Sequence, residues 1–495
     1  MKRLSKKQMI IFAIGQLGWS ILSGIIGAWL VTFFLPTQGD IVDKGAISYL
    51  VPGLLGGFIT VLGIITAGSR IFDAVTDPLI ASLSDRSKNP KGRRIPFMRI
   101  AAIPLSIVTC LLFCVDFGKH DSQFGWLNIV WVSVMIVLFY LFMTMYCTPY
   151  NALISEFGKT QEDRMFISTS ISLTFFAGTL LAYTPFAFAG LLQGAVGFAW
   201  SYRICFIVLA VIACVCMLLP TFLLNEKEFV EGKPSEENVL KSLTSTFKNK
   251  DFRTFSISDI MYWVGLTMFQ TGLPFFVKVS MDLPEIMVIG LMGGMTVLSA
   301  CFYPFVTGLV KKFGKKKLVI FGFLGLAVCY AITAVSSIPG VCPVEGADAT
   351  LLSWVFGIAV MIIAAFPMAL LGIIPQSIVA DVAEAESITT GQNREGMFFA
   401  ARTFAMKFGQ SLAMVLFTTF AIIGAEQIPG SNDIAASKQG LMIAAIVAVA
   451  FCVAGAVILL FYREKKIMKT IAKEVDEDFM KAIESEKDLG EEEKE

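Results

Sequence analysis

Twelve long stretches without a charged residue constrain what this chain can fold into. They cover residues 8–39, 45–69, 100–115, 122–155, 165–202, 204–225, 260–277, 286–310, 318–344, 349–380, 408–425 and 439–462. A helix crosses a hydrocarbon core with roughly 20 residues, and most of the stretches are that long. Two shorter ones extend backwards, to Ile95 across Arg99 and to about Gly396 across Lys407 and Arg402. We therefore predict an all-α integral membrane protein with twelve transmembrane helices.

The composition excludes several other classes of protein. The chain is 56% hydrophobic and 16% charged, whereas a soluble domain is nearer 45–50% apolar and about 25% charged. A net charge of +1 gives no reason to expect nucleic acid as a partner. The one histidine, His120, leaves no His-based metal site or catalytic triad, so we do not expect an enzyme. Of the ten cysteines only Cys342 lies in a polar connection, so no disulfide framework is expected.

One long polar segment near the middle of the chain divides the predicted helices six and six. We expect an N-terminal bundle over residues 1–224, a middle loop over 225–252, a C-terminal bundle over 253–462 and a charged tail over 463–495. A Gly- and basic-rich loop follows the second helix of each half, which is a weak internal repeat. Such paired halves, here two six-helix bundles, are typical of transporters.

The positions of the basic residues predict the orientation in the cell membrane. Loops on the cytoplasmic side are rich in Lys and Arg. We therefore expect both termini and the middle loop to be cytoplasmic, and Cys342 to be accessible from outside. The basic residues on the cytoplasmic side are Lys2, Arg3, Lys6, Lys7, Arg86, Lys88, Lys91, Arg93, Arg94, Lys311, Lys312 and Lys315 to Lys317.

Two carboxylates stand inside the second predicted helix, in the segment Arg70-Ile-Phe-Asp73-Ala-Val-Thr-Asp77-Pro78. A charge at mid-bilayer costs at least about 2.5–3.5 kcal/mol. Asp73 and Asp77 are four residues apart and share one helix face, so they repel each other. A bound cation would remove that penalty, and so would a proton. The alternative is a structural ion pair with Arg70 or Lys407.

Other polar residues are predicted at a similar depth. The 1.5 Å rise per residue places Asp73 and Thr144 about 18 Å from the cytoplasmic side, Lys407 about 16 Å and Ser20 about 20 Å. Transporters bind substrate and coupling ion near this level. Arg402 has two interpretations. It either extends to the membrane interface or turns into the cavity, where it would favour an anionic solute.

Four motifs carry a resemblance that spans roughly residues 8 to 462. They are the 70–78 segment followed by Asp85-Arg86 and Gly92-Arg93-Arg94; Asp381-Val-Ala-Glu384 with Arg394-Glu395-Gly396 and Lys407-Phe-Gly409; Thr144 with Pro149-Tyr150; and Gly15-Gln16-Leu17-Gly18. With these motifs the chain resembles the glycoside–pentoside–hexuronide:cation symporters, melibiose-carrier-like members of the major facilitator superfamily. The resemblance implies alternating access, a monovalent cation bound at Asp73 and Asp77 with Thr144 nearby, and Lys407 as a coupling residue.

The chain departs from that family at the sugar-binding positions. The family's sugar carriers usually place an acid on helix 1 and another on helix 4, an aromatic residue on helix 4 and an arginine on helix 5. The cation site is thus kept while the sugar-binding acids are absent, so galactoside recognition is not implied. We expect the substrate contacts to come from Gln16, Ser20, Ser23, Cys147, Asn151, Ser172 and Arg402.

These observations predict a symporter that couples Na⁺, with H⁺ or Li⁺ as alternatives, to import of a small polar solute. A glycoside-type carbohydrate is the expected substrate. A hexuronide or sulfosugar anion and an amphipathic solute are the alternatives within transport. A receptor or scaffold would leave the mid-membrane carboxylates unexplained. We expect a monomer in the lipid bilayer, with no cofactor other than the coupling ion.

Overall fold

The computed structural model describes residues 3–55, 59–85, 87, 89, 92–158, 160–229, 246–343, 349–390, 395–428 and 432–472. The first half contains α1 (Lys6–Phe34), α3 (Val61–Asp85), α4 (Ile95–Phe113), α5 (Trp126–Phe157), α6 (Gln161–Tyr183), α7 (Pro185–Val196) and α8 (Phe198–Leu223). The second half contains α11 (Lys250–Phe275) with the π-helical turn η1 (Phe276–Ser280), α12 (Ile286–Phe313), α13 (Lys315–Ser336), α14 (Leu351–Thr390), α15 (Glu395–Phe420) and α16 (Lys438–Leu459). Short elements are α2 (Gln38–Val42), α9 (Glu226–Phe229) and the antiparallel pair β1 (Leu54–Leu55) and β2 (Ile59–Thr60).

Ten segments of the described chain are long and apolar enough to cross a membrane, with α6 and α7 forming one of them. Two more helices, α3 and α15, have the necessary length but carry charged residues in their middle. In α3 these are Arg70, Asp73 and Asp77, and in α15 they are Arg402 and Lys407. Within the described residues the prediction of an all-α protein with twelve spanning helices is therefore confirmed.

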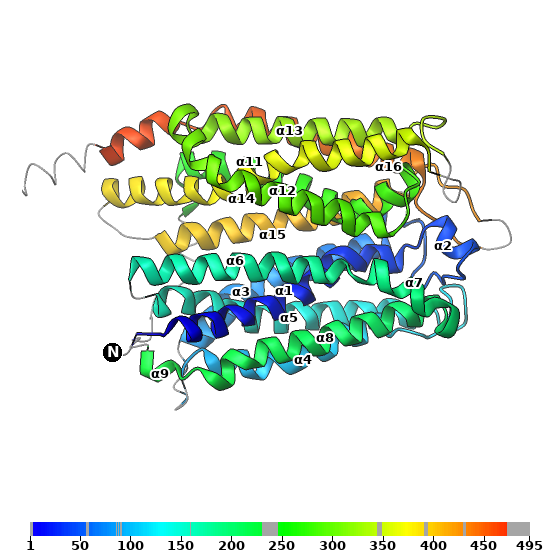
Figure 1. Cartoon of the computed structure of the whole chain (residues 1–495), viewed down its shortest axis with the longest axis horizontal. Helices are drawn as coiled ribbons and strands as arrows, with labels where there is room; N and C mark the ends of the chain where they lie inside the picture. Colours follow the sequence, from blue (N-terminus) through cyan, green and yellow to red (C-terminus); the bar gives the residue numbers. More distant parts are fainter. Residues whose placement is uncertain are drawn as a thin grey trace, which may run out of the picture.

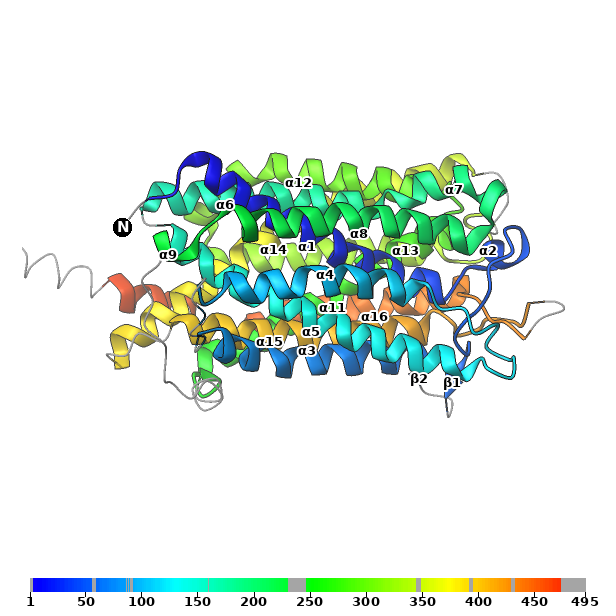
Figure 2. The same cartoon turned by 90° about the horizontal axis from the view of Figure 1, so that it is seen from below.

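The twelve helices form two groups. Figure 1 shows α1, α3, α4, α5, α6 and α8 in the lower half and α11 to α16 in the upper half. Within the first group α1 packs against α6 and α8, and within the second α13 packs against α14 and α16. The groups meet mainly where α3 lies along α15, with further contacts of α1 with α11 and of α6 with α12. Figure 2 shows the same bundle from below, with β1 and β2 at the end away from the N-terminus.

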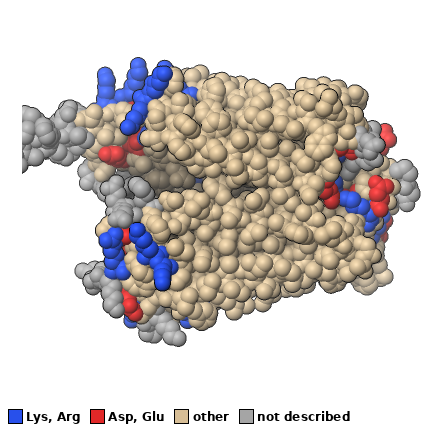
Figure 3. Space-filling model, in the orientation of Figure 1, with Lys and Arg blue, Asp and Glu red and all other residues tan. Residues whose placement is uncertain are grey.

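Charged side chains gather at the two ends of the molecule. Figure 3 shows Lys, Arg, Asp and Glu at both ends and an uncharged band between them. A band of this kind matches the hydrocarbon region of a bilayer. We call the end at which α1 begins the N-terminal face and the other end the opposite face. Near the N-terminal face the surface in Figure 3 is indented between the two groups.

The structure corrects three details expected from the uncharged stretches. Arg203 lies inside α8 and not in a loop, and its buried guanidinium donates to the carbonyl oxygens of Phe113 and Val115. Cys342 is 4% exposed, so its loop position does not make the thiol accessible. The helix predicted over 349–380 continues to Thr390, because the charges after residue 380 lie beyond the apolar band and no longer limit the helix.

The described start of the expected middle loop holds the first helix group together. Glu226 in α9 accepts hydrogen bonds from the backbone N–H groups of Arg93, Arg94 and Ile95 at the start of α4. A carboxylate is favourable there because the first N–H groups of a helix lack helical partners. Residues 230–245 of the loop and 473–495 of the tail lie outside the described residues.

Close packing of α1 against α8 depends on Gly18. A Cβ added at Gly18 would lie 2.5 Å from the carbonyl oxygen of Ala213, whereas one added at Gly27 meets nothing within 4 Å. We predict that Gly18→Ala lowers stability by about 1–3 kcal/mol, because backbone atoms of α8 must shift. The measurement is the thermal unfolding midpoint of the detergent-purified variant. Gly27→Ala on the same helix is the control, and equal midpoints for both variants would contradict the prediction.

Candidate ion and substrate site

A cluster of charged and polar side chains lies between the two helix groups. Thr144 Oγ1 of α5 is 2.7 Å from Asp73 Oδ1 and 3.0 Å from Asp77 Oδ1. Lys407 Nζ of α15 is 2.8 Å from Asp73 Oδ2 and 2.5 Å from Asp77 Oδ2. Asp73, Thr144 and Lys407 are all buried, and the Asp77 side chain is 25% exposed. Each carboxylate thus contacts the hydroxyl with one oxygen and the ammonium with the other.

The contacts around Thr144 have one proton too few. A threonine hydroxyl has one hydrogen to donate, yet two carboxylate oxygens lie within 3.0 Å of Thr144 Oγ1. One of these two oxygen–oxygen contacts therefore has no proton between its atoms. Among the described residues Lys407 is the one cation within 3 Å of both carboxylates, and Arg70 lies 4.0 Å from Asp73 alone. A proton, or a cation with oxygen ligands, would remove the repulsion between these oxygen atoms.

The local sequence explains why these groups meet. Asp73 and Asp77 are one turn apart on α3, so both point to the same side of the helix. Pro78 follows inside the helix and has no N–H, so the carbonyl oxygen of Ala74 loses its helical partner. This adds a further oxygen acceptor to the same stretch of α3.

The ion pairs with Arg70 and Lys407, expected as the alternative to a cation site, are both present, but their distances differ. Arg70 lies 4.0 Å from Asp73 and stacks over the ring of Tyr140, 4.6 Å from its centroid. Lys407 makes the shorter contacts, and it connects α15 of the second group to α3 of the first. The strong pair therefore does more than hold one bundle together, because it crosses the boundary between the two groups.

The residues expected to contact substrate on α1 are mostly packed inside the first group. Gln16 Nε2 donates to Ser20 Oγ at 2.9 Å, and both side chains are buried. A Cβ added at Gly178 of α6 would lie 2.7 Å from Ser20 Cβ, so Ser20 faces α6. Ser23 is half-buried and donates to the Ser20 carbonyl oxygen.

The expected residues of α5 and α6 do not form one cluster with those of α1. Cys147 is half-buried, with its sulfur 3.5 Å from that of Met143. Asn151 and Ser172 are exposed, and Ser172 donates to the carbonyl oxygen of Ser168 in its own helix. The structure therefore brings together the four expected cation-site and coupling residues, while the expected substrate contacts remain dispersed.

Arg402 is paired inside the second group. Its Nε and Nη2 atoms donate to the two carboxylate oxygens of Asp259 on α11, at 3.0 and 3.3 Å. The Arg402 side chain is 11% exposed and that of Asp259 is 1% exposed. This two-point contact satisfies much of the guanidinium and cancels its charge.

A ring of four alternating charges, which sequence reasoning missed, joins the groups at the opposite face. Lys44 contacts Asp40 at 3.0 Å, Asp40 contacts Lys278 at 2.5 Å, Lys278 contacts Glu285 at 2.9 Å, and Glu285 contacts Lys44 at 2.8 Å. Asp40 and Lys44 belong to the first group, and Lys278 and Glu285 to the second. The only sequence signal was the Asp40–Lys44 spacing of four residues in a segment that looked like an ordinary polar loop.

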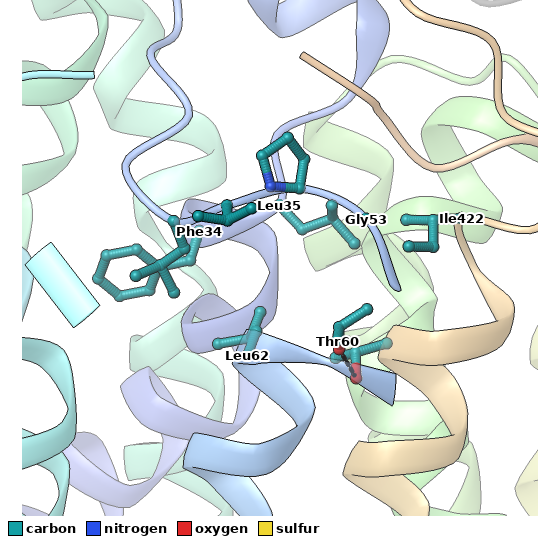
Figure 4. Close-up of a pocket in the computed structure, with 10 residues that line it drawn as sticks. Phe34, Leu35, Gly53, Thr60, Leu62 and Ile422 are labelled. Atoms are coloured by element: carbon teal, nitrogen blue, oxygen red, sulfur yellow. Dashed lines mark hydrogen bonds between the residues drawn. The ribbon is translucent and has the colours of Figure 1, made fainter. Parts of the chain in front are cut away.

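Other contacts at the opposite face also cross between the groups. Lys119 contacts Asp433 at 2.8 Å, and the hydroxyl of Thr60 lies 2.9 Å from that of Thr418. A small pocket lies beside the two threonines, lined by Phe34, Leu35, Leu50, Val51, Pro52, Gly53, Thr60, Leu62, Thr418 and Ile422 (Figure 4). Apart from the two hydroxyls, which bond each other, its side chains are apolar. This pocket therefore offers little to a polar solute.

At the N-terminal face the ion pairs that the structure shows connect helices within one group. Arg94 contacts Glu156 at 2.7 Å in the first group, and Lys315 contacts Asp381 at 2.5 Å in the second. The two groups are thus fastened at the centre and at the opposite face, and the indentation in Figure 3 lies at the other end.

Two six-helix groups around a buried charge cluster define a membrane transporter of the major facilitator type. The family described as MFS/sugar transport protein matches residues 11–465, and this chain belongs to that family. The protein is therefore a transporter and not an enzyme.

Several relatives match most of the chain, among them two that are symporters by name. The uncharacterized symporter YjmB of Bacillus subtilis (strain 168) is 25% identical over 83% of this chain and 82% of that protein. The putative glycoside/cation symporter YagG of Escherichia coli (strain K12) is 23% identical over 92% of this chain and 89% of that protein. The crystal structure of the nucleoside transporter NupG is similar in fold, with a TM-score of 0.61 at 15% identity over 92% of this chain and 99% of that chain.

The charge ring yields a prediction about the opposite face. Asp40→Asn leaves the buried Lys278 with one carboxylate fewer, and removing one partner of a buried pair costs about 3–5 kcal/mol. We expect the two groups to separate there, measured as a longer distance between spin labels at Gln123 and Glu426 in a background without native cysteines. Asp43→Asn, an exposed change at the same face, is the control.

Asp40 is expected to remain charged throughout the physiological pH range. Burial raises the pKa of Asp40, but Lys278 and Lys44 outweigh it and hold the pKa below its ordinary value of 3.8. Its contribution is therefore complete above about pH 4 and is lost only as the pH falls further. The spin-label distance between positions 123 and 426 is measured at pH 8 and pH 5 in a Lys119→Gln, His120→Gln background, which removes the other ion pairs with Asp433 at this face. A longer distance at pH 5 would contradict the prediction that Asp40 stays charged.

Proposed function

We propose that this protein is a secondary active symporter that couples the entry of Na⁺, or alternatively H⁺, to the uptake of a small neutral carbohydrate of the glycoside type. The observation that carries the proposal is the Asp73–Asp77–Thr144–Lys407 cluster. It combines a buried and a half-buried carboxylate with one ammonium from the other helix group. If a bound cation replaces the Lys407 ammonium at these carboxylates, a contact between the two helix groups is weakened. Ion binding is then linked to the relative position of the groups.

The coupling step follows from the contacts of Lys407. A cation bound by Asp73, Asp77 and Thr144 competes with the ammonium for the same carboxylates. When the cation enters, Lys407 loses part of its attachment to α3, and the free energy of the contact between α3 and α15 changes. The change acts in both directions, so a substrate that favours the same arrangement of the groups also raises cation affinity.

The arrangement of contacts also supports an orientation. Basic residues are concentrated on the loops of the N-terminal face, and we propose that this face is cytoplasmic. The structure would then be an inward-facing state, with the four-charge ring and the Thr60–Thr418 contact closing the outside. The ring must open, and contacts must form at the cytoplasmic face, for substrate to enter from outside.

The pairing of Arg402 favours a neutral solute over an anion. Asp259 already occupies the guanidinium with two hydrogen bonds, so a hexuronide or sulfonate would have to displace a buried carboxylate. A neutral solute requires no such exchange. The name of the relative YagG, a putative glycoside/cation symporter, supports the same substrate class. An anionic substrate is the second candidate, and it rests on the presence of Arg402 in α15.

The coupling proposal is tested in right-side-out vesicles with a panel of labelled methyl glycosides. We expect an inward Na⁺ gradient to drive accumulation of at least one of them, and Asp77→Asn to abolish that accumulation because it removes an anionic cation ligand. Exchange of substrate at equal concentrations is expected to persist. Accumulation by Asp77→Asn at the wild-type level would refute the cation site. Accumulation driven by a pH gradient alone would assign H⁺ in place of Na⁺.

The charge of the substrate is tested at Arg402. We predict that Arg402→Gln with Asp259→Asn retains uptake of a neutral methyl glycoside within a few fold, because both charges of the pair are removed together. Arg402→Gln alone is expected to lower the amount of folded protein, since Asp259 is then buried without its partner. Half-saturation concentrations for neutral and anionic glycosides provide the measurement. If the wild type prefers a hexuronide and the double variant no longer takes it up, the result would favour an anionic substrate bound by Arg402.

A further inference from the structure

One face of α11 carries several buried polar groups that the coupling mechanism does not use. Ser256, Trp263, Thr267 and Gln270 recur at spacings of seven, four and three residues, so they form one stripe along the helix. Ser256 Oγ and Thr267 Oγ1 are buried, and each is without a hydrogen-bond partner among the described residues. The indole Nε1 of Trp263 neighbours the Asp259 carboxylate but makes no hydrogen bond of ordinary geometry.

This stripe lies on a side of α11 that its neighbours cover only in part. α11 is covered by α15 and α16 of its own group and contacts α1 of the other group. Between Ser258 and Phe275 the residues of α11 that are not buried are Ile260, Met261, Trp263 and Gln270. Trp263 and Gln270 belong to the stripe, so the side of α11 that carries the unpartnered hydroxyl groups is covered only in part, as is the side of Ile257 and Met261.

Neighbouring helices contribute polar atoms of the same kind. Gly409 brings α15 against α11, because a Cβ there would lie 3.0 Å from Trp263 Cβ. The next residue, Gln410, has a buried Oε1 without a partner in the described chain. On α1, which packs against α11 across the boundary, the half-buried Trp19 has a buried Nε1 that likewise lacks one. Three helices from both groups therefore present unused hydrogen-bonding atoms.

Folded proteins rarely leave buried polar atoms unpaired, and those that remain call for a ligand, water or functional explanation. Here the unpaired atoms are neutral: two hydroxyls, one amide oxygen and an indole N–H, beside the ring of Trp263. Hydroxyl-rich solutes can donate to and accept from such groups, and indole rings pack against the apolar faces of sugar rings. An anion finds no unpaired cation in this set, because Arg402 is bound to Asp259.

We propose that Ser256, Trp263 and Thr267 of α11, with Gln410 of α15 and Trp19 of α1, form the carbohydrate-binding surface of this transporter. The assignment rests on the proposed function and deepens it. It places the substrate contacts on the second group and the α1 boundary, and not at the dispersed positions Cys147, Asn151 and Ser172. Because α1 and α11 belong to different groups, a solute held between them makes contacts that depend on how the groups are arranged.

The test replaces the Thr267 hydroxyl by a methyl group of similar size. For the methyl glycoside that the wild type accumulates, Thr267→Val is expected to raise the half-saturation concentration about tenfold, which corresponds to one lost hydrogen bond. The unfolding midpoint without substrate is expected to stay the same or rise, since an unpaired buried hydroxyl is removed. Thr271→Val, one turn away, is the control, because Thr271 Oγ1 contacts Met414 Sδ toward α15.

A structural role and a binding role give different results. If Thr267 only packs, Thr267→Val and Thr271→Val have the same half-saturation concentration as the wild type, and the binding surface is refuted while the symporter proposal stands. If the wild type accumulates none of the methyl glycosides, both the substrate class and this surface are wrong. Weaker glycoside binding in Thr267→Val, with unchanged Na⁺ dependence of the remaining uptake, would support it. Trp263→Leu is expected to weaken binding more than Trp263→Phe, which keeps an aromatic ring.

Discussion

The contact between Lys407 and the two carboxylates of α3 is the interaction on which the rest of this transporter depends. Charges at this depth in a membrane are costly unless they are paired. Asp73 and Asp77 cannot balance each other, and the compensating ammonium comes from the other helix group. The helices that would be least stable alone in a bilayer, α3 and α15, are therefore the pair along which the two groups meet. The contacts of Lys407 with Asp73 and Asp77 therefore neutralise the carboxylates and also hold the two helix groups together.

The central cluster and the four-charge ring fasten the same boundary in different ways. In the centre two carboxylates share one close ammonium and one hydroxyl proton, with Arg70 4.0 Å from Asp73, so an added cation can compete for their oxygen atoms. At the opposite face two carboxylates meet two ammonium groups in a closed ring, and no charge is missing. Under the proposed function the first arrangement would respond to an ion, and the second would close a face with a fixed set of charges. A transporter that alternates between two openings needs both kinds of contact.

The polar groups of the two halves serve different purposes. On α1, Gln16 and Ser20 bond each other and pack against α6, so they stabilise the first group and offer little to a solute. On α11 the hydroxyls of Ser256 and Thr267 have no such partners among the described residues. Arg402 and Asp259 cancel each other beside them. The expected substrate contacts Gln16, Ser20 and Arg402 are therefore occupied by internal contacts, while unpaired neutral groups remain on α1, α11 and α15.

The sequence by itself determined the class of fold and half of the ion site. Uncharged stretches fix the spanning helices because hydropathy and length act locally along the chain, and the spacing of Asp73 and Asp77 already places them on one helix face. Thr144 and Lys407 were reached through family resemblance and estimated depth, and the contacts among the four residues required the packing of α3, α5 and α15. Only the tertiary structure decided the four-charge ring, the Arg402–Asp259 pair and the orientation of Ser20. Each depends on which side chains from distant segments become neighbours, and a one-dimensional pattern of charge and hydropathy does not contain that information.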